Sequence, residues 1–462
     1  MLDTVLLWAE KNKGRWLGDL KSWLSIPSVS TQPEHEGDVR AAADWAKDYL
    51  RTIGMTVEII PTKRHPCILA TTPPHLCPPD APHVLLYGHY DVQPAEPLEL
   101  WETPAFMPAV RDDKLFARGA CDDKGQVHCH LAALTAWKEI NHAFPCRVTI
   151  ILEGEEEIGS PNLMDVVKAH AELLKTAKVL IVSDTNQFAE GVPSITYGLR
   201  GLAGFEIVLN GASTDLHSGM YGGAVANPAH VLCEIIGKLH DADGRVTVPG
   251  FYDDVQALTE QERKMWAGLP FSEEAFAREL GIKEVFGEAG FTTLERKWAR
   301  PTLEVNGLTS GYQGPGGKTV LPCRASAKIT CRLVPNQDPQ KIGDACEAYI
   351  RSLAGSRVTV EVLRSKGGSP PAITPIDSPA MHAAAEALEI GFGKPPIFQR
   401  EGGSIPVVAW FKEALGLDTI MVGFGLPNDR IHAPNEKLDL SCYYGGIRTA
   451  AALYDLLGSQ LK

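Results

Sequence analysis

Residues 147–157 read RVTIILEGEEE, an apolar stretch that leads directly into a cluster of carboxylates. A short run of Val, Ile and Leu is typical of a strand that is buried on both faces, as strands of parallel sheets are. Three adjacent carboxylates at the end of such a strand need nearby cations to offset their charge. The stretch therefore predicts a buried strand that ends in a charged site.

The segments on either side continue this pattern. From Pro82 to Asp184 the sequence alternates strand, helix, strand, helix and strand. Strands are expected at 83–87, 147–152, 179–182 and 419–422, and helices at 124–139 and 162–175. Strands that alternate with helices predict an α/β domain with a mainly parallel sheet and helices on both faces.

Polar residues follow the ends of these strands, where open α/β sheets bind ligands. The candidate metal ligands are His89, Asp122, Glu157, Asp184 and His432. Two imidazoles with several carboxylates suit divalent ions such as zinc or manganese. Taken singly, each piece has an ordinary explanation: a polar strand end, a solvated acidic turn or a loop histidine. Their shared placement favours a metal site.

Between residues 199 and 374 the pattern changes. Strands are expected at 201–211, 301–308, 323–335 and 357–363, with helices at 227–241 and 339–355. The order β-α-β-β-α-β is that of a ferredoxin-like α+β unit, here with a mostly helical insertion at about 242–300. The sequence therefore predicts a first domain at 1–198, a second at 199–374 and a return to the first at 375–462.

Length and composition narrow the class of protein. A chain of 462 residues favours two domains, and a formal charge of −13 argues against a nucleic-acid partner. The N-terminus does not have the form of a signal peptide, and no apolar stretch is long enough to span a membrane. Ten scattered cysteines without a C-x-x-C motif are typical of reduced thiols in the cytoplasm.

The candidate ligands suit a pair of divalent cations. Asp122, Glu157 and Asp184 would return three of the four positive charges, and the remaining charge favours a polarised carbonyl and a bound hydroxide. Asp122 is the candidate for the shared carboxylate, because its loop leads directly into a helix. Asp91, two residues after His89, points the same way in an extended segment and can accept the second imidazole N–H. Glu156, beside Glu157, is free to take a proton from the attacking water.

Several segments together resemble a known family, the co-catalytic zinc exopeptidases that include carnosinase-type dipeptidases, glutamate carboxypeptidases, aminoacylases and succinyl-diaminopimelate desuccinylases. These segments are YGHYDVQP, ARGACDDKGQ, EGEEEIGS, SDT, DLHSG, REGGSIP and IHAPNE. The resemblance covers nearly the whole chain. WARPTLEVNGLTSGYQGPGGKTVLP and RLVPNQDP are similar to the dipeptidase branch.

The resemblance implies a role for each candidate in the first domain. His89, Asp122 and Asp184 would hold one metal, and Asp122, Glu157 and His432 the other. Glu156 would be the general base that activates a metal-bridging water, and Asp91 would orient His89. The family pattern also implies a cis peptide bond between Asp122 and Asp123. Zinc is the expected ion, two per subunit, with manganese and cobalt as alternatives.

For the second domain, the resemblance implies a lid and a homodimerisation surface formed by the helix at 227–241 and an edge strand. His217 would reach the partner's active site and stabilise the oxyanion. Arg332 would bind the substrate's free carboxylate, with Thr319 and Ser404 nearby. Without the family pattern, His217 is an ordinary loop histidine and Arg332 a surface cation.

The leading hypothesis is a cytoplasmic, homodimeric metallopeptidase that cleaves dipeptides or short peptides with a free C-terminus. The Asp at position 184 favours peptidases, because several deacylases of the family carry Glu there. One alternative is an N-acyl amino acid deacylase that uses the same two-metal site. Another is a non-catalytic relative that binds a ligand or partner in its cleft. The native metal and the preferred side chains stay open.

Overall fold

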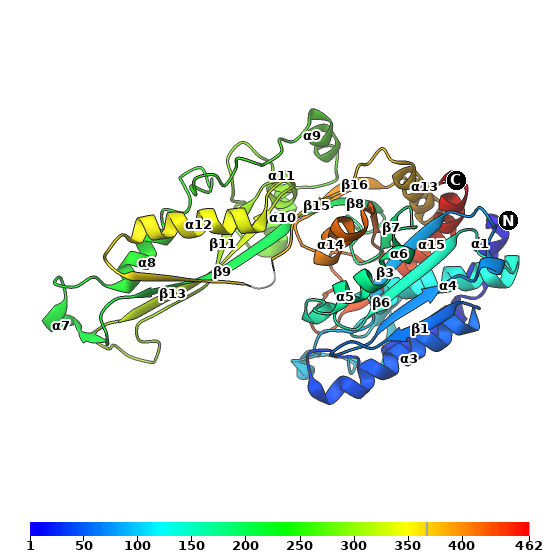
Figure 1. Ribbon diagram of the computed structural model, residues 1–462, viewed down its shortest axis with the longest axis horizontal. Helices are drawn as coiled ribbons and strands as arrows, with labels where there is room; N and C mark the ends of the chain where they lie inside the picture. Colours follow the sequence, from blue (N-terminus) through cyan, green and yellow to red (C-terminus); the bar gives the residue numbers. More distant parts are fainter. Residues whose placement is uncertain (366–367, 462) are drawn as a thin grey trace. The chain divides into compact units, whose positions relative to one another are not determined.

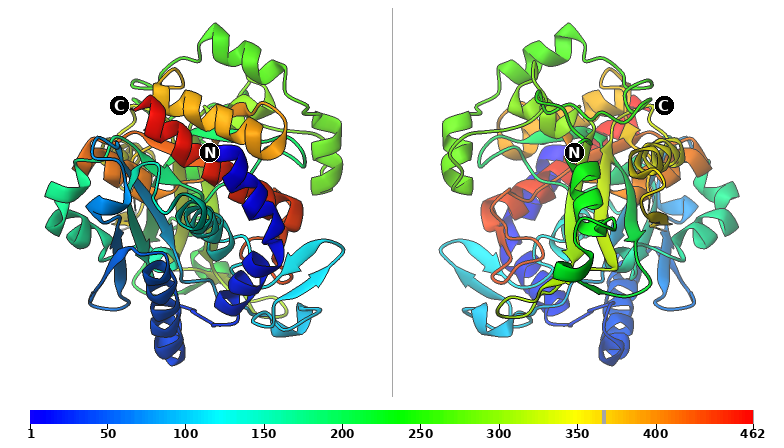
Figure 2. Two further views of the ribbon diagram at one scale, coloured as in Figure 1. Left: turned by 90° about the vertical axis from the view of Figure 1, so that its right-hand side faces the viewer. Right: turned by 90° about the vertical axis from the view of Figure 1, so that its left-hand side faces the viewer.

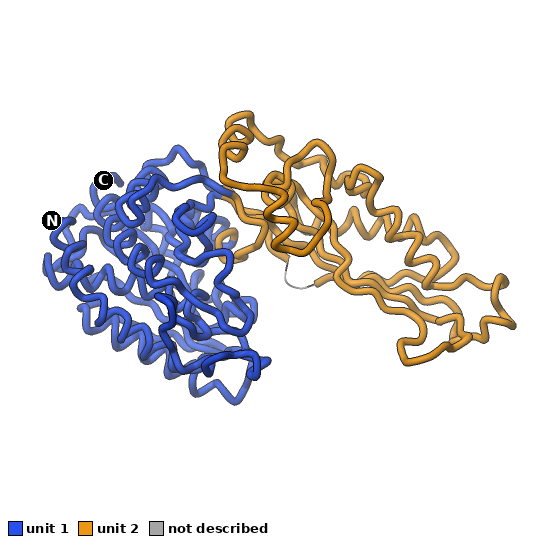
Figure 3. The backbone as a smooth tube through the Cα atoms, turned by 180° about the vertical axis from the view of Figure 1, so that it is seen from behind, with its two compact units in different colours: residues 1–197, 374–399, 410–462 blue, residues 198–373, 400–409 orange. Residues whose placement is uncertain are grey.

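The computed structural model describes residues 1–365 and 368–461 and divides into two compact units (Figures 1 and 3). Unit 1 comprises residues 1–197, 374–399 and 410–462, and unit 2 comprises residues 198–373 and 400–409. The sequence-based division placed 400–409 in the first domain. These residues cluster with unit 2, where the Arg200 guanidinium Nε donates to the Gly402 carbonyl at 3.0 Å.

A nine-stranded sheet positions the candidate ligands. Its order is β1 (Thr56–Ile60), β2 (Cys67–Thr71), β6 (Arg147–Glu153), β3 (His83–His89), β7 (Leu180–Val182), β17 (Thr419–Val422), β8 (Ser194–Leu199) and β15 (Ala372–Ile373), with β16 (Ile397–Glu401) also paired to β8. The four central strands β6, β3, β7 and β17 are mutually parallel, and their carboxyl ends share one edge. The outer pairs are antiparallel. The predicted α/β class with a mainly parallel centre is confirmed, while the antiparallel edges were not foreseen.

Helices cover both faces of this sheet in unit 1. On one face, Phe411 of α14 (Pro406–Leu415) packs its ring against Tyr87 of β3, with centroids 5.6 Å apart. On the other face, Val127 of α4 (Lys124–Asn141) lies so close to Gly88 that an added Cβ would meet its Cγ2 at 2.4 Å. Gly88 therefore allows the helix that follows Asp122 to approach the strand that ends at His89.

Further α-helices belong to unit 1. They are α1 (Leu2–Lys11), α2 (Lys13–Leu24), α3 (Glu36–Thr52), α5 (Leu163–Ala169), α6 (Ala171–Leu174), α13 (Pro379–Phe392) and α15 (Leu440–Gln460). The N-terminal α1 and the C-terminal α15 lie side by side (Figure 2). The helix predicted at 162–175 is broken at His170 into α5 and α6. A small sheet of β18 (Lys437–Asp439), β5 (Lys114–Phe116) and β4 (Ala109–Arg111) completes the unit.

Unit 2 has the predicted ferredoxin-like order. Its antiparallel sheet runs β11 (Thr302–Ser310), β13 (Arg324–Leu333), β9 (Gly201–Asn210) and β14 (Thr359–Arg364), with helices α8 (Pro228–Ile236) and α12 (Pro339–Ala354). Each helix starts with proline after a side-chain cap: Asn227 accepts from the Ala229 amide, and Asp338 accepts from the Lys341 amide. The α+β class of this region is confirmed.

The insertion in unit 2 contains three short helices joined by loops: α9 (Glu260–Ala267), α10 (Glu273–Leu280) and α11 (Thr293–Trp298). Capping boxes start α9 at Thr259 and α11 at Thr292. A separate two-stranded antiparallel sheet pairs β10 (Leu216–His217) with β12 (Val320–Leu321), and α7 (Ser218–Tyr221) follows β10. Among the residues that the structure describes, no helix is long and apolar enough to cross a membrane. All ten cysteines are free.

Candidate metal centre

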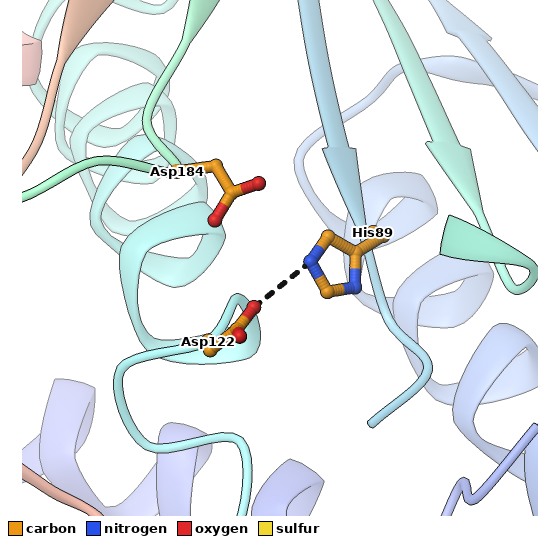
Figure 4. A group of neighbouring side chains, drawn as sticks. All are labelled: His89, Asp122 and Asp184. Atoms are coloured by element: carbon orange, nitrogen blue, oxygen red, sulfur yellow. Dashed lines mark ion pairs between the residues drawn. The ribbon is translucent and has the colours of Figure 1, made fainter. Parts of the chain in front are cut away.

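The first ligand group lies past the carboxyl ends of β3 and β7. His89 is the last residue of β3, a strand buried along its whole length, and its Nε2 lies 3.1 Å from Asp122 Oδ1. Figure 4 shows the side chains of His89, Asp122 and Asp184 pointing toward one another from three separate segments. One ligand atom from each lies within 4.8 Å of the other two, a spacing that suits one cation.

The second group shares Asp122 with the first. His432 Nε2 lies 2.9 Å from Asp122 Oδ2 and 3.4 Å from Glu157 Oε2. The ligand atoms of these three residues again lie within 4.8 Å of one another. Asp122 thus presents one oxygen to each group, as a carboxylate shared by two cations would. The five predicted ligand candidates converge as two triplets with one common member.

The Asp122 loop is held by a buried carboxylate from the other end of the chain. Glu436 accepts from the backbone amides of Cys121 and Asp122 at 2.9 and 3.1 Å through one oxygen. Its other oxygen accepts from the Gly119 amide at 3.1 Å and from Arg118 Nη1 at 2.7 Å. These four bonds fix the backbone just before Asp122. The Asp122–Asp123 bond is cis, as the family resemblance implied.

The four glutamates at the end of β6 have different surroundings. Glu153 accepts from the Tyr87 hydroxyl at 2.5 Å and from the Ser160 hydroxyl at 2.8 Å. Glu155 accepts from the Thr62 hydroxyl, the His65 amide and the Asn162 side chain. These two carboxylates are therefore engaged in holding loops together. Glu157 lies in the second ligand group. Among the described residues, the carboxylate of Glu156 has no hydrogen-bond or ion-pair partner, which distinguishes it from the other three.

Asp91 links His89 to the turn that carries Glu156 and Glu157. Its carboxylate lies 3.4 Å from His89 Nδ1, and its main-chain oxygen lies 3.1 Å from the same nitrogen. The two carboxylate oxygens also accept from the amides of Glu156 and Glu157 at 3.2 and 3.1 Å, and one of them from the Ser30 hydroxyl at 2.6 Å. One buried side chain therefore orients the His89 ring and the turn that carries Glu156.

The electrostatics of the site follow from crowding and burial. Burial and the neighbouring Glu157 and Asp122 raise the pKa of Glu156 to about 7, against the lowering effect of His89. Burial and Asp122 raise the pKa of Asp184 well above its usual value. Burial alone would also raise the pKa of Asp122, but hydrogen bonds with His432 and His89 hold it well below the usual range. Bound cations would compensate this accumulation of buried negative charge.

The donor set fits two divalent cations. His89 Nε2 is buried and faces Asp122 Oδ1 at 3.1 Å, while its ring is held through Nδ1. A neutral imidazole presents such a nitrogen to a metal while its other nitrogen donates to a carboxylate or carbonyl. Two imidazoles and three carboxylates, divided between two overlapping groups, match a co-catalytic site with an Asp bridge.

Four other candidates lie in unit 2. His217 is exposed at the end of β10, and its Nδ1 accepts from the Gly219 amide at 3.0 Å. The Thr319 carbonyl, just before β12, accepts from the amide of Ser218, the first residue of α7, at 3.1 Å. Arg332, on β13, donates from Nη1 to the Ser404 hydroxyl at 2.8 Å. The structure thus brings Arg332 and Ser404 into contact and places Thr319 beside the residue that follows His217.

Sequence reasoning did not assign several supporting residues. Glu436 stands in the quoted IHAPNE segment, but its partners lie more than three hundred positions earlier in the chain. Gln93, two residues after Asp91, donates to Glu157 Oε2 at 2.7 Å. Its position beside the H-x-D pair is a local clue that could have suggested this role. Ser30 gives no such clue, because only the fold brings it to Asp91.

Comparison with known proteins agrees with this geometry. A family model described as peptidase family M20/M25/M40 matches residues 85–455. This chain belongs to that family. The Cys-Gly metallodipeptidase DUG1 of Candida albicans is 31% identical over 97% of this chain and 95% of its own length. The human Beta-Ala-His dipeptidase is 28% identical over 98% of this chain and 92% of its own length.

A solved structure shows the same fold. The structure of the dipeptidase Dug1p from Saccharomyces cerevisiae superposes with a TM-score of 0.83 at 28% identity, covering 100% of this chain and 99% of that chain. Family membership, together with the two overlapping ligand groups, identifies the chain as a dinuclear metallodipeptidase of the M20 family. The expected hydrolase class is confirmed.

Proposed function

We propose that this M20 metallodipeptidase cleaves dipeptides with a free C-terminal carboxylate, with Glu156 as the proton-transfer group. One observation carries the proposal: two triplets of ligand atoms share Asp122 and lie beside a turn that presents Glu156. The names of the similar proteins make Cys-Gly and β-Ala-His the first substrates to examine.

We assign His89, Asp122 and Asp184 to one cation and Asp122, Glu157 and His432 to the other, with zinc as the ion. Two such cations would polarise the scissile carbonyl and lower the pKa of a bound water to about 7. The ligand types are compatible with manganese or cobalt as well. The support for zinc is the presence of two imidazoles among five ligands.

Glu156 is suited to move a proton because its carboxylate has a pKa raised to about 7, chiefly by burial. In the proposed reaction, Glu156 takes a proton from the attacking water. The water oxygen bonds to the carbonyl carbon, the C–N bond breaks, and Glu156 returns the proton to the leaving amine. Asp91 contributes by holding both the His89 ring and the amide of Glu156.

Unit 2 supplies the proposed recognition of substrate ends. The Arg332 guanidinium would bind the free carboxylate through its fork of N–H donors, with Ser404 beside it. Thr319 would bind substrate together with His217, because its carbonyl accepts from the Ser218 amide. We further propose that His217 donates to the oxyanion in the site of a second copy of the chain. Its exposure at the end of β10 in unit 2 supports this assignment. The enzyme would then be a cytoplasmic homodimer, with unit 2 as lid and dimerisation domain.

A substrate panel tests the proposal. Purified enzyme loaded with zinc, manganese or cobalt is assayed on Cys-Gly, β-Ala-His, other dipeptides, tripeptides and N-acetyl amino acids. We expect the highest kcat/KM on a dipeptide and loss of activity when the C-terminus is amidated. Preferential cleavage of N-acetyl amino acids would replace the dipeptidase assignment with that of a deacylase. Sedimentation of the same preparation reports whether the protein is a dimer.

A further inference from the structure

Arg200 is a half-buried cation in unit 2 that has no role in the proposed chemistry. Its Nε donates to the Gly402 carbonyl at 3.0 Å, and its Nη1 reaches the Arg300 carbonyl at 3.4 Å. Its own backbone amide donates to the Glu401 carbonyl at 3.3 Å. A single residue therefore ties the 400–404 segment to the end of the α11 region through both its side chain and its main chain.

The 400–404 segment carries Ser404, which contacts Arg332. Ser404 donates its hydroxyl hydrogen to the Arg200 carbonyl at 2.5 Å and accepts from Arg332 Nη1 at 2.8 Å. The chain of contacts runs from Arg200 through the 400–404 segment and Ser404 to the Arg332 guanidinium. Each link joins residues of the same compact unit.

Gly402 shows that this segment has little room to move. A Cβ at position 402 would lie 2.9 Å from the Lys297 carbonyl and 3.0 Å from Arg200 Nη2. The guanidinium and the α11 backbone thus press against the segment from two sides. The close approach accounts for a glycine here, because a larger residue would displace either contact.

Arg200 and Arg332 also share surroundings. Both line a cavity of about 970 Å³ in unit 2, together with Thr330, Thr302 and Glu304 of the sheet. Burial and the nearby Arg332 charge lower the pKa of Arg200 to about 10. Two neighbouring guanidinium groups repel each other, so Arg332 keeps its position only if other contacts hold it.

We infer that Arg200 is a positioning residue for substrate recognition: it locks the 400–404 segment so that Ser404 holds the Arg332 guanidinium ready for the substrate carboxylate. This inference rests on the proposed role of Arg332. Substitution of Arg200 would loosen Arg332 and weaken binding of the free carboxylate. The proton-transfer group Glu156 belongs to the other unit and is not part of this chain of contacts.

The test uses the ratio of kcat/KM for a dipeptide to kcat/KM for its C-terminal amide, measured on the metal-loaded, full-length enzyme. For Arg200→Met we expect roughly a tenfold fall in this ratio, carried by a higher KM for the free acid, since a charge-assisted hydrogen bond has about that effect on binding. Arg351→Met is the matched control, because Arg351 pairs with Glu347 within α12 on the surface of the same unit. It should keep the ratio within twofold.

Two further variants separate positioning from charge. Arg200→Lys keeps the cation but has no planar fork to reach two carbonyls, so it should recover little of the ratio. Ser404→Ala combined with Arg200→Met should be no worse than the more damaging single substitution, because both break one chain of contacts. Full recovery by Lys, or multiplied losses in the double variant, would overturn the positioning role.

Failure of the underlying proposal has a separate signature. If Arg332→Met leaves the acid-to-amide ratio intact, Arg332 does not bind the carboxylate and the proposed recognition is wrong. If Arg332→Met lowers the ratio but Arg200→Met does not, the positioning role of Arg200 is wrong and the proposed role of Arg332 stands. Should Arg200→Met unfold, Gly402→Ala displaces the same segment and must lower the ratio in its place. Thermal unfolding of each variant checks that the comparison is made on folded protein.

Discussion

Both units bury an apolar core, and unit 1 also buries a cluster of histidines and carboxylates. Unit 1 encloses histidines and carboxylates at the carboxyl edge of its sheet, with His89 and Asp91 fully buried and Asp122 nearly so. The core of unit 2 is built from aliphatic and aromatic residues on one side of an antiparallel sheet, such as Phe205, Ile207 and Leu209. The charged residues of unit 2 that matter for recognition line a cavity on its surface instead.

The two units therefore differ in what stabilises them. Burying apolar surface stabilises unit 2 without help from ions or protons. In unit 1 the buried carboxylates and imidazoles are stable only when charge is balanced by partners, cations or protonation. Unit 1 should therefore respond to metal and pH, and unit 2 should respond mainly to changes in packing.

The largest expected effect concerns Glu156. Glu156→Gln should reduce kcat by about a thousandfold, because the amide cannot accept the proton from water. Both cations should remain bound, since Glu156 lies in neither ligand group. Steady-state kinetics with metal analysis of the same sample provide the measurement, and Glu156→Asp is the control for retained carboxylate chemistry. Turnover near that of the unmodified enzyme would remove Glu156 from the mechanism.

Cation binding should stabilise the units unequally. Zinc at about a thousand times its dissociation constant should raise the free energy of unfolding of unit 1 by about 4 kcal/mol. Hydrogen exchange followed by mass spectrometry, with and without chelator, reports each unit separately. Asp122→Asn should abolish the difference, because Asp122 belongs to both ligand groups. If the chelator changed the protection of peptides from β9 and β3 equally, the contrast between the units would be wrong.

A change at the recognition residue of unit 2 should act on KM. Arg332→Met should raise KM for a free dipeptide between about tenfold and a hundredfold, the range for one charged hydrogen-bonding partner. The change in kcat should be much smaller than that of Glu156→Gln. Kinetics on one dipeptide with both variants make the comparison direct. A loss confined to kcat would place Arg332 in the chemistry and not in recognition.

His128 and His130, both buried in α4 of unit 1, should each make that unit less stable in acid. Burial lowers the pKa of His128 and His130 to about 3 from the ordinary 6.5. The unfolded chain therefore takes up these protons first, so stability is complete above about pH 6.5 and falls as the pH drops toward 3. The loss at pH 5 is about 2 kcal/mol for each histidine.

Hydrogen exchange at pH 7 and pH 5 measures this loss in each unit. His130→Gln should reduce the loss of stability of unit 1 at pH 5 by about 2 kcal/mol, the contribution of one histidine. The same substitution at His230, an exposed residue on α8 of unit 2, serves as the control. An acid response of the same size in the core of unit 2 would show that buried histidines are not its cause.

The fold and the ligand set could be predicted because both depend on local pattern. Apolar runs that end in polar residues identify strands, and the carboxyl ends of parallel strands meet at one edge. His89, Glu157 and Asp184 follow three such strands, β3, β6 and β7. The antiparallel outer strands were missed, because pairing direction depends on which strands become neighbours. The break at His170 was missed because the apolar spacing continues across it.

The division of labour among the glutamates was decided by tertiary contacts. Nothing in GEEE distinguishes a structural carboxylate from a ligand. Glu155 accepts hydrogen bonds from Thr62, His65 and Asn162. Asp91 instead accepts from the backbone amides of Glu156 and Glu157 and so holds the turn that carries them. These partners come from distant parts of the chain, so the roles emerge only when the chain packs.

By itself, the sequence determined the kind of chemistry: hard ligands placed after apolar strands, with one carboxylate more than two cations need. Tertiary structure alone decided which oxygen faces which nitrogen, because contacts such as that of Glu436 with the Asp122 loop join residues more than three hundred positions apart. Hydrogen bonds depend on distances of a few tenths of an ångström, and only packing sets those distances.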